Sequence, residues 1–214
     1  MTAYYWHFCP VGRDGVPRLG YQDGREVKVG ETLTVGGKPL LCQRGLHCSE
    51  RIIDALRYAG GRVVLCRVVP AGQMVRGGDK LAAQQRTCVA MLTVEQTDAL
   101  LREFARWCAL SVAHLWEMPT EVRAYLETGD SSLLAAAADA YAYVYVGADA
   151  YVDAAAVHAA ALSNYVSAAA IDARFAVSHE GGAGYDPARH AAARTAHETE
   201  LRRLWREYTG EVLA

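Results

Sequence analysis

Leu-Leu-Cys-Gln-Arg-Gly-Leu-His-Cys-Ser, residues 40–49, leads into a short amphipathic helical pattern over residues 50–58 and a nearly continuous apolar strand over residues 62–69. Ser49 is placed to cap the helix, and the Gly60-Gly61 pair is placed to end it. A short helix between strands of a mostly antiparallel set is typical of an α+β domain. This stretch therefore predicts the fold class of the first part of the chain.

The rest of the first 92 residues reads as short strands separated by turns. Besides the central strand, we expect strands at residues 3–9, 26–29, 32–35, 39–42 and 87–92. A loop rich in Gly, Asp and Pro over residues 10–24 and the Gly36-Gly37 pair separate them. Residues 1–92 are therefore expected to form a small, mostly antiparallel sheet domain with one short helix.

From Thr93 the apolar residues recur at helical spacing. Helical segments are expected at residues 93–115, 119–127, 131–177 and 187–208. Pro119 suits the first turn of its helix, and His197 is expected near a wet face. Residues 93–214 therefore predict an all-α domain with alanine-rich helices.

The composition is that of a globular protein whose charge differs between its two parts. The chain has 214 residues, of which 52% are apolar and 21% charged, with a net charge of -2. Residues 1–95 carry 13 Lys and Arg and 8 Asp and Glu, whereas residues 96–214 carry 9 and 16. A mildly basic first part favours a phosphate-bearing ligand, but the excess is small for a dedicated duplex-binding surface.

Cysteine usage and hydropathy indicate an intracellular protein without a membrane span. The six cysteines include no CxxC pair and lie mostly in apolar patterns, so we expect buried free thiols. No signal peptide precedes the first strand, which favours the cytoplasm. The longest uncharged run, residues 154–171, is mostly alanine and too weakly apolar for lipid.

Several short motifs resemble an uncharacterised domain of phage and bacterial hypothetical proteins. They are Trp6-His7-Phe8, Leu41-Cys42, Gly45 to Ser49, Asp54 to Ala59, Asp79-Lys80-Leu81 and Arg86-Thr87. In those proteins an alanine-rich helical tail often follows, as it does here from Leu133. The resemblance implies a phage or prophage setting, and thus the host-cell cytoplasm, but no catalytic residue.

His47 is the first candidate for a functional residue because it follows Gly45 at the end of a strand and precedes a helix. Backbone amides of Glu50 and Arg51 would point near the same space and form a modest anion site. Histidine titrates near neutral pH, so His47 is a candidate acid or base. The alternative is a histidine packed on the sheet with one nitrogen on a carbonyl. Ser49 is a ligand-binding candidate, although its hydroxyl suits a helix cap better than a nucleophile.

A second group of polar residues follows the Gly77-Gly78 turn. Lys80 could bind phosphate while Asp79 orients a hydroxyl group or the lysine itself. Gln85 and Arg86 precede an apolar strand, and Arg86 could stack on a ligand or form a forked pair with it. The alternative for all four is an ordinary solvated turn and strand edge.

His7 is the second candidate catalytic residue, because strand alternation points it away from its aromatic neighbours Trp6 and Phe8. A histidine in a first strand loosely resembles the nicotinamide-dinucleotide site of ADP-ribosyltransferase-like folds. That resemblance lacks a late glutamate, unless Gln85 or Glu95 takes its place.

Metal binding is a weaker possibility. His7, His47 and either Cys42 or Cys48 offer zinc ligands but lack paired spacing. We therefore predict no metal, and the sequence identifies no cofactor.

Two functions from different classes follow. The first is a phage-type accessory protein that binds or acts on a nucleotide or nucleic acid through a mildly basic cleft, with ADP-ribosyltransferase-like chemistry as one form. The second is a non-enzymatic structural protein that forms homo-oligomers or binds a host factor through its Ala/Tyr-rich helices.

Overall fold

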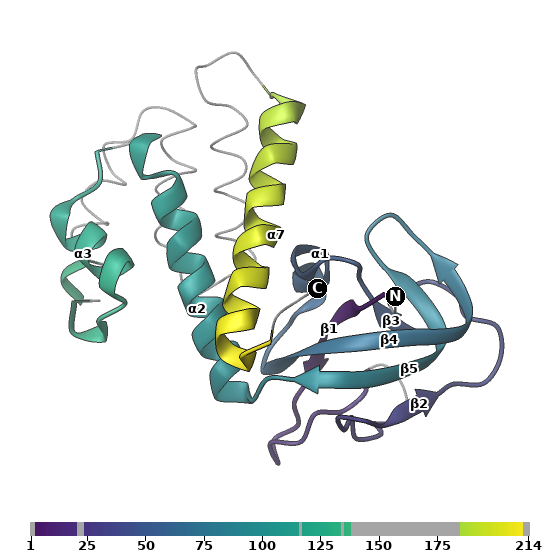
Figure 1. The fold of residues 1–214 in the computed structure, drawn as a ribbon. Helices are drawn as coiled ribbons and strands as arrows, with labels where there is room; N and C mark the ends of the chain where they lie inside the picture. The colour runs from purple at the N-terminus through teal and green to yellow at the C-terminus, as the bar shows by residue number, and fades with distance from the viewer. Residues whose placement is uncertain (1–2, 21–23, 116, 134, 138–184, 212–214) are drawn as a thin grey trace. The chain divides into compact units, whose positions relative to one another are not determined.

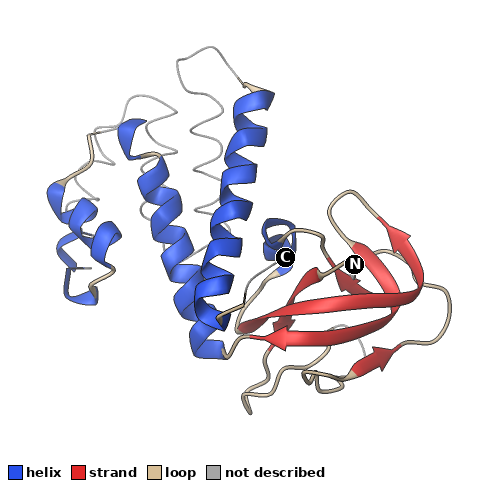
Figure 2. Ribbon diagram, viewed as in Figure 1, coloured by secondary structure: helices blue, strands red, loops and turns tan. Residues whose placement is uncertain are grey.

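The computed structural model describes residues 3–20, 24–115, 117–133, 135–137 and 185–211 (Figure 1). The chain forms two compact units. The first comprises residues up to Asp98 together with the segment from Trp205 onward, and the second comprises Ala99–Leu204. All the described strands lie in the first unit, and most of the length of the long helices lies in the second. Figure 2 shows the strands and helices of this α+β fold, which is confirmed.

The first unit is built on a five-stranded sheet in which every strand pairing is antiparallel. The strands are β1 (Tyr5–Pro10), β2 (Thr32–Thr34), β3 (Leu46–Cys48), β4 (Val63–Arg76) and β5 (Leu81–Met91). Their order is β1-β4-β5-β2, and β3 also pairs with β5. The predicted mostly antiparallel sheet is therefore confirmed.

The β4–β5 hairpin is longer than the sequence pattern predicts. Its turn is formed by residues 77–80, and the Gly77 N–H donates to the Lys80 carbonyl at 2.8 Å. Pro70 and Gly72 read as strand breakers, but Pro70 is paired opposite Arg86, and the register shift between Ala71 and Met74 places Gly72 in a bulge. The hairpin therefore continues well beyond the predicted strand end at residue 69.

Strands β1 and β3 close the sheet into a ring of backbone pairing. The Trp6 N–H donates to the Ser49 carbonyl at 2.8 Å, and the Ser49 N–H donates to the Trp6 carbonyl at 2.9 Å. Strands β1, β4, β5 and β3 are thus connected in a closed circuit. One face of β1 contributes Tyr5 and Cys9 to an apolar cluster within the ring.

Helix α1 (Ile52–Ala55) continues into a 3₁₀ turn, η1 (Leu56–Tyr58). The predicted start at residue 50 and the Ser49 cap are wrong, because Arg51 is the N-cap and no side chain caps the helix. The pairing of Ser49 with β1 keeps the backbone extended up to Arg51. The predicted strands at residues 26–29 and 39–42 are reduced to isolated bridges.

The described helices that follow are close to their predicted positions. They are α2 (Val94–Ser111), α3 (Thr120–Thr128) and α7 (Pro187–Thr209), with 3₁₀ turns at Ala113–Leu115 and Ser131–Leu133. His197 is 2% exposed and contacts the rings of Phe104 and Trp107, so its expected wet position is wrong. Most of the predicted alanine-rich segment, residues 131–177, lies outside the described residues. Among the helices that are described, none has the length and apolar character needed to cross a membrane.

The end of α7 is fastened to the sheet within the first unit. Trp205 packs edge-on against Trp6, with ring centroids 4.9 Å apart, and both side chains are buried. Arg67 of β4 pairs with Glu211 at 2.7 Å, and the Trp205 indole N–H donates to the same carboxylate. The C-terminal segment is therefore part of the structure that supports β1 and β4.

Candidate functional site

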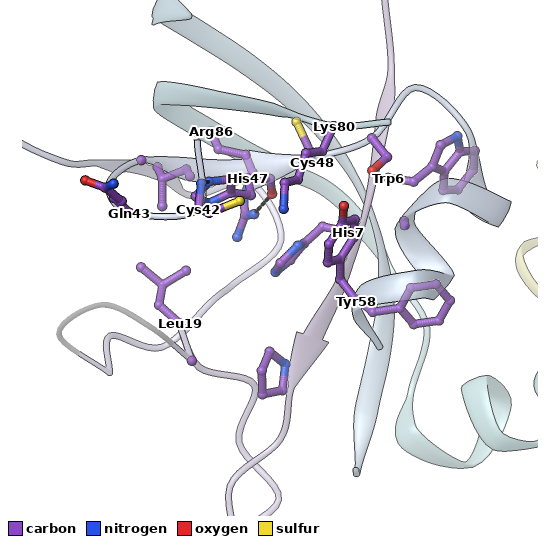
Figure 3. Close-up of a pocket in the computed structure, with 17 residues that line it drawn as sticks. Trp6, His7, Leu19, Cys42, Gln43, His47, Cys48, Tyr58, Lys80 and Arg86 are labelled. Atoms are coloured by element: carbon purple, nitrogen blue, oxygen red, sulfur yellow. Dashed lines mark hydrogen bonds between the residues drawn. The ribbon is translucent and has the colours of Figure 1, made fainter. Parts of the chain in front are cut away.

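A pocket of about 310 Å³ opens within the first unit, and Figure 3 shows its lining side chains. Its walls come from β1, the loop after β1, the loop before β3, β3 and the α1–η1 turn, with Lys80 just before β5 and Arg86 in the middle of β5. The polar and ionisable lining residues are His7, Cys42, Gln43, His47, Cys48, Ser49, Tyr58, Lys80 and Arg86. Apolar wall residues include Phe8, Pro10, Leu19 and Leu46. The pocket thus gathers residues from segments that are distant in sequence.

Arg86 is the most unusual residue of this site. Its side chain belongs to β5, is 3% exposed and lines the pocket. The Nη1 group donates to the His47 carbonyl, whereas the buried Nη2 group has no hydrogen-bond partner among the described residues. Buried polar groups are nearly always hydrogen-bonded, and buried charges are usually paired. A buried guanidinium with one N–H group that lacks an acceptor is therefore unusual and needs a physical explanation.

His7 reaches the pocket from β1, on the strand face that sequence alternation predicts. Burial, followed by the positive charge of Arg86 and by His47, lowers the pKa of His7 well below its usual value. The imidazole is therefore neutral near pH 7. A neutral imidazole can accept a proton at one nitrogen and donate a hydrogen bond from the other.

His47 lines the same pocket from β3, and its ring is held by the loop that precedes the strand. The Cys42 N–H donates to His47 Nε2 at 3.1 Å, from a backbone with φ of 62°. Burial, Lys80 and Arg86 lower the pKa of His47, while a hydrogen bond with the Gly45 backbone opposes that change. This geometry resembles the packed-histidine alternative more than a free acid or base, and the catalytic role of His47 stays a prediction.

Lys80 and Tyr58 form the exposed side of the pocket. The Lys80 ammonium lies 4.0 Å from the centroid of the Tyr58 ring, which is a cation–π contact. Burial alone would lower the pKa of Lys80, but the side chains of Cys42 and Tyr58 raise it overall. Lys80 is therefore a cation at neutral pH, and Figure 3 shows it on the same side of the pocket as His7 and Tyr58.

The remaining predicted residues do not all reach the pocket. Ser49 lines it, but its backbone is occupied by the pairing with β1. Asp79 accepts hydrogen bonds from Tyr58 at 2.8 Å and Arg57 at 3.1 Å, and it is not part of the lining. Gln85 is exposed and also lies outside the lining. The site therefore brings together His7, His47, Ser49, Lys80 and Arg86 from the predicted set.

Sequence reasoning missed Tyr58 as a site residue and left Cys42 and Cys48 only as alternatives. Tyr58 is the last residue of η1, in the short helical segment that begins soon after Ser49. Because Ser49 pairs with Trp6 of β1, this segment lies beside the pocket and Tyr58 lines it. Cys42 is the exposed member of six otherwise buried free cysteines. Burial raises the pKa of the Cys48 thiol to about 12, so this residue lines the pocket as a neutral group.

The electrostatic character of the pocket is positive. Among the lining residues that the structure describes, Lys80 and Arg86 are cations and none is Asp or Glu. Across residues 3–20, 24–115 and the later described ranges, no three His, Cys, Asp or Glu side chains are grouped as metal ligands. The arrangement can therefore receive an anion, with two neutral imidazoles beside it.

Comparison with known proteins finds one similarity. Residues 20–100 match the family described as a domain of unknown function, DUF7666. This segment contains β2 to β5, the α1–η1 turn and most of the pocket, but it leaves out β1 with His7. No curated protein matches the chain. No solved structure matches it either.

Proposed function

We propose that the pocket binds a nucleotide-like ligand and that its phosphate group is received by Arg86. The observation that carries this proposal is the buried Nη2 group of Arg86, which has no hydrogen-bond partner among the described residues. An unsatisfied buried donor costs about 1–3 kcal/mol, and more when it is charged. A phosphate oxygen at this position would supply the missing acceptor and a counter-charge together.

The neighbours of Arg86 support an anion rather than a neutral ligand. Lys80 adds a second positive charge at the exposed side, and the described lining contributes no carboxylate to repel an anion. His7 adds a neutral imidazole within the same space. Oriented donors and fixed charges of one sign are the elements from which phosphate sites are built.

The apolar wall supports an organic body attached to that phosphate. Leu19, Pro10 and Leu46 line the pocket, and the exposed ring of Tyr58 lies at its side. Small-molecule sites are mostly apolar clefts of roughly 300–1,000 Å³ with a few placed polar groups. The volume of about 310 Å³ lies at the small end of that range and suits a ligand no larger than a mononucleotide.

Catalysis by the same site is part of the proposal only through His7. A neutral histidine beside a phosphate can accept a proton, and the lowered pKa of His7 makes it a weak base near pH 7; hydrolysis or transfer at the bound ligand is the reaction class that would use such a base. ADP-ribosyltransferase-like transfer would lack its acidic residue here, because Gln85 and Glu95 are both outside the pocket lining. The phage setting and the host-cell cytoplasm follow from the sequence resemblance alone and stay predictions.

A thermal-shift screen of the full chain tests the proposal. The probes are the four nucleoside 5′-monophosphates, nicotinamide adenine dinucleotide and inorganic phosphate, each with wild type, Arg86→Met and Arg123→Gln. The last variant removes an exposed arginine of α3 and serves as the charge control. At a ligand concentration of about 100 Kd the folded state gains about 2.7 kcal/mol, which a melting curve detects.

We expect a nucleotide to raise the melting temperature of wild type and Arg123→Gln but not that of Arg86→Met. A shift that survives in Arg86→Met would contradict the role of the guanidinium. The absence of any shift in wild type would overturn the nucleotide proposal and favour the structural protein with homo-oligomer or host-factor contacts, which light scattering would then examine.

A further inference from the structure

We infer that the pocket selects a terminal phosphate monoester, as in a mononucleotide, over the phosphodiester of a nucleic-acid strand. This inference rests on the proposed function, because it specifies the ligand class of the same site. Three observations carry it: the charges of the pocket, the depth of Arg86, and the number of groups that can contact a phosphate.

The charges of the pocket match a dianion. Arg86 and Lys80 are its two described cations, and the nearby carboxylate of Asp79 is already engaged by Arg57 and Tyr58. A phosphate monoester carries close to two negative charges at neutral pH, since its second pKa is about 6. Each phosphodiester carries only one. The monoester therefore neutralises both cations, whereas the diester leaves one of them without a counter-charge.

The burial of Arg86 favours a phosphate at the end of a ligand over a phosphate in the middle of a nucleic-acid strand. Its side chain is 3% exposed and lines the pocket from β5. A monoester phosphorus bears one organic substituent, so it can enter first while the sugar and base remain nearer the opening. A diester phosphorus bears two substituents, and both would have to fit between the buried guanidinium and the opening of a pocket of about 310 Å³.

The contact groups match three terminal oxygens. Arg86 Nη2, the Lys80 ammonium and the His7 imidazole all belong to the lining, and Figure 3 shows them turned toward the same part of the pocket. A monoester offers three terminal oxygens to these groups. A diester offers two, because the other two oxygens are esterified.

Isothermal titration of the full chain tests the inference. The ligands are the nucleoside 5′-monophosphate that gives the largest thermal shift, the methyl ester of that same phosphate, and a short single-stranded oligonucleotide with hydroxyl groups at both ends. The methyl ester keeps the base and the sugar and changes only the number of charges and of free oxygens. Wild type, Arg86→Met and the control Arg123→Gln are titrated with each ligand.

We expect the methyl ester to bind at least about tenfold more weakly than the monophosphate, and the oligonucleotide to show no binding that depends on Arg86. Equal affinity for monophosphate and methyl ester, with both lost in Arg86→Met, would overturn the inference and leave the proposed function standing. Tighter binding of the oligonucleotide than of the monophosphate would also overturn the inference and leave the proposed function standing. Binding of all ligands that is unchanged in Arg86→Met would overturn the proposed function itself.

Discussion

Arg86 is a buried cation whose hydrogen-bonding groups are only partly satisfied among the described residues. The guanidinium is buried, makes one hydrogen bond to the His47 carbonyl, and leaves Nη2 without a described partner. Folding would gain more from an apolar side chain of similar length at this position. Retaining a cation there is physically reasonable when a bound anion satisfies it.

Replacing Arg86 by Met is expected to keep the free energy of unfolding within about 1 kcal/mol of wild type or to raise it. The variant loses one hydrogen bond but also removes a buried, incompletely paired charge, and these effects are of similar size. Urea denaturation followed by circular dichroism measures the difference. A loss above about 3 kcal/mol would show that the link to the His47 carbonyl is a structural cross-link instead.

The lowered pKa of His7 makes the stability of the protein depend on pH. The unfolded chain protonates this residue near pH 6.5, whereas the folded state protonates it only at well below that value. Between these values the unfolded state binds more protons, so the free energy of unfolding falls as pH decreases below about 6.5. His47, whose pKa is also lowered, contributes with the same sign.

Urea denaturation at pH 7.5 and 5.5 measures this effect, which has an upper bound of about 1.4 kcal/mol per pH unit for each histidine. We expect His7→Gln to reduce the pH dependence relative to wild type. An unchanged pH dependence in His7→Gln would contradict the burial of a neutral imidazole at this position.

At the scale of single elements, the sequence predicts local periodicity well and long-range pairing poorly. The helices that begin after Thr93, Pro119 and Asp186 follow from apolar spacing and proline position, which are local signals. The three-residue strand β3 has too few residues for alternation to be recognised. Its pairing with β5 and the bridge from Ser49 to Trp6 depend on residues distant in the sequence.

The same distinction explains the candidate site. His47, Lys80 and Arg86 follow from their places at turns and strand ends, and His7 follows from strand alternation; all four line the pocket. These side chains come together only because the pairing of Trp6 with Ser49 joins β1 to β3, and no local sequence pattern predicts that pairing. Tyr58 could not be predicted as a site residue for the same reason, since the end of η1 reaches the pocket through this long-range pairing.

Gly45 supplies a prediction at the scale of β3. Its φ is +127°, and an added Cβ would lie 3.0 Å from the Ala82 side chain and 3.3 Å from the Ala83 carbonyl. Gly45→Ala is therefore expected to destabilise the protein by about 1–3 kcal/mol and to displace the loop that holds His47. Gly60→Ala is the control, because its added Cβ would meet nothing within 4 Å.

Chemical denaturation compares these two glycine variants with wild type. If Gly45→Ala were as stable as Gly60→Ala, the close approach of β3 to β5 at this position would be wrong.

At the scale of the whole molecule, the C-terminal segment returns to the first unit. Trp205 contacts Trp6 and shares Glu211 with Arg67, so residues about 140 or more positions apart support β1 and β4 together. Since β1 also carries His7, this support holds one wall of the pocket. The sequence predicts the last helix only as part of the helical domain, and no local pattern indicates the contact between Trp205 and Trp6.

Trp205→Ala is expected to cost about 3–5 kcal/mol of unfolding free energy, because it removes a fully buried aromatic side chain. Tyr185→Ala, at a position 56% exposed, is the matched aromatic control and should change stability little. Urea denaturation followed by circular dichroism gives both values. A cost below about 1 kcal/mol for Trp205→Ala would mean that the segment does not support the sheet.

The most direct test of the binding site is a crystal structure of the full chain soaked with a nucleoside 5′-monophosphate. We expect a phosphate oxygen within about 3.2 Å of Arg86 Nη2, with the Lys80 ammonium on the same phosphate. A ligand bound elsewhere, or a pocket in which a protein carboxylate already pairs with Arg86, would contradict it.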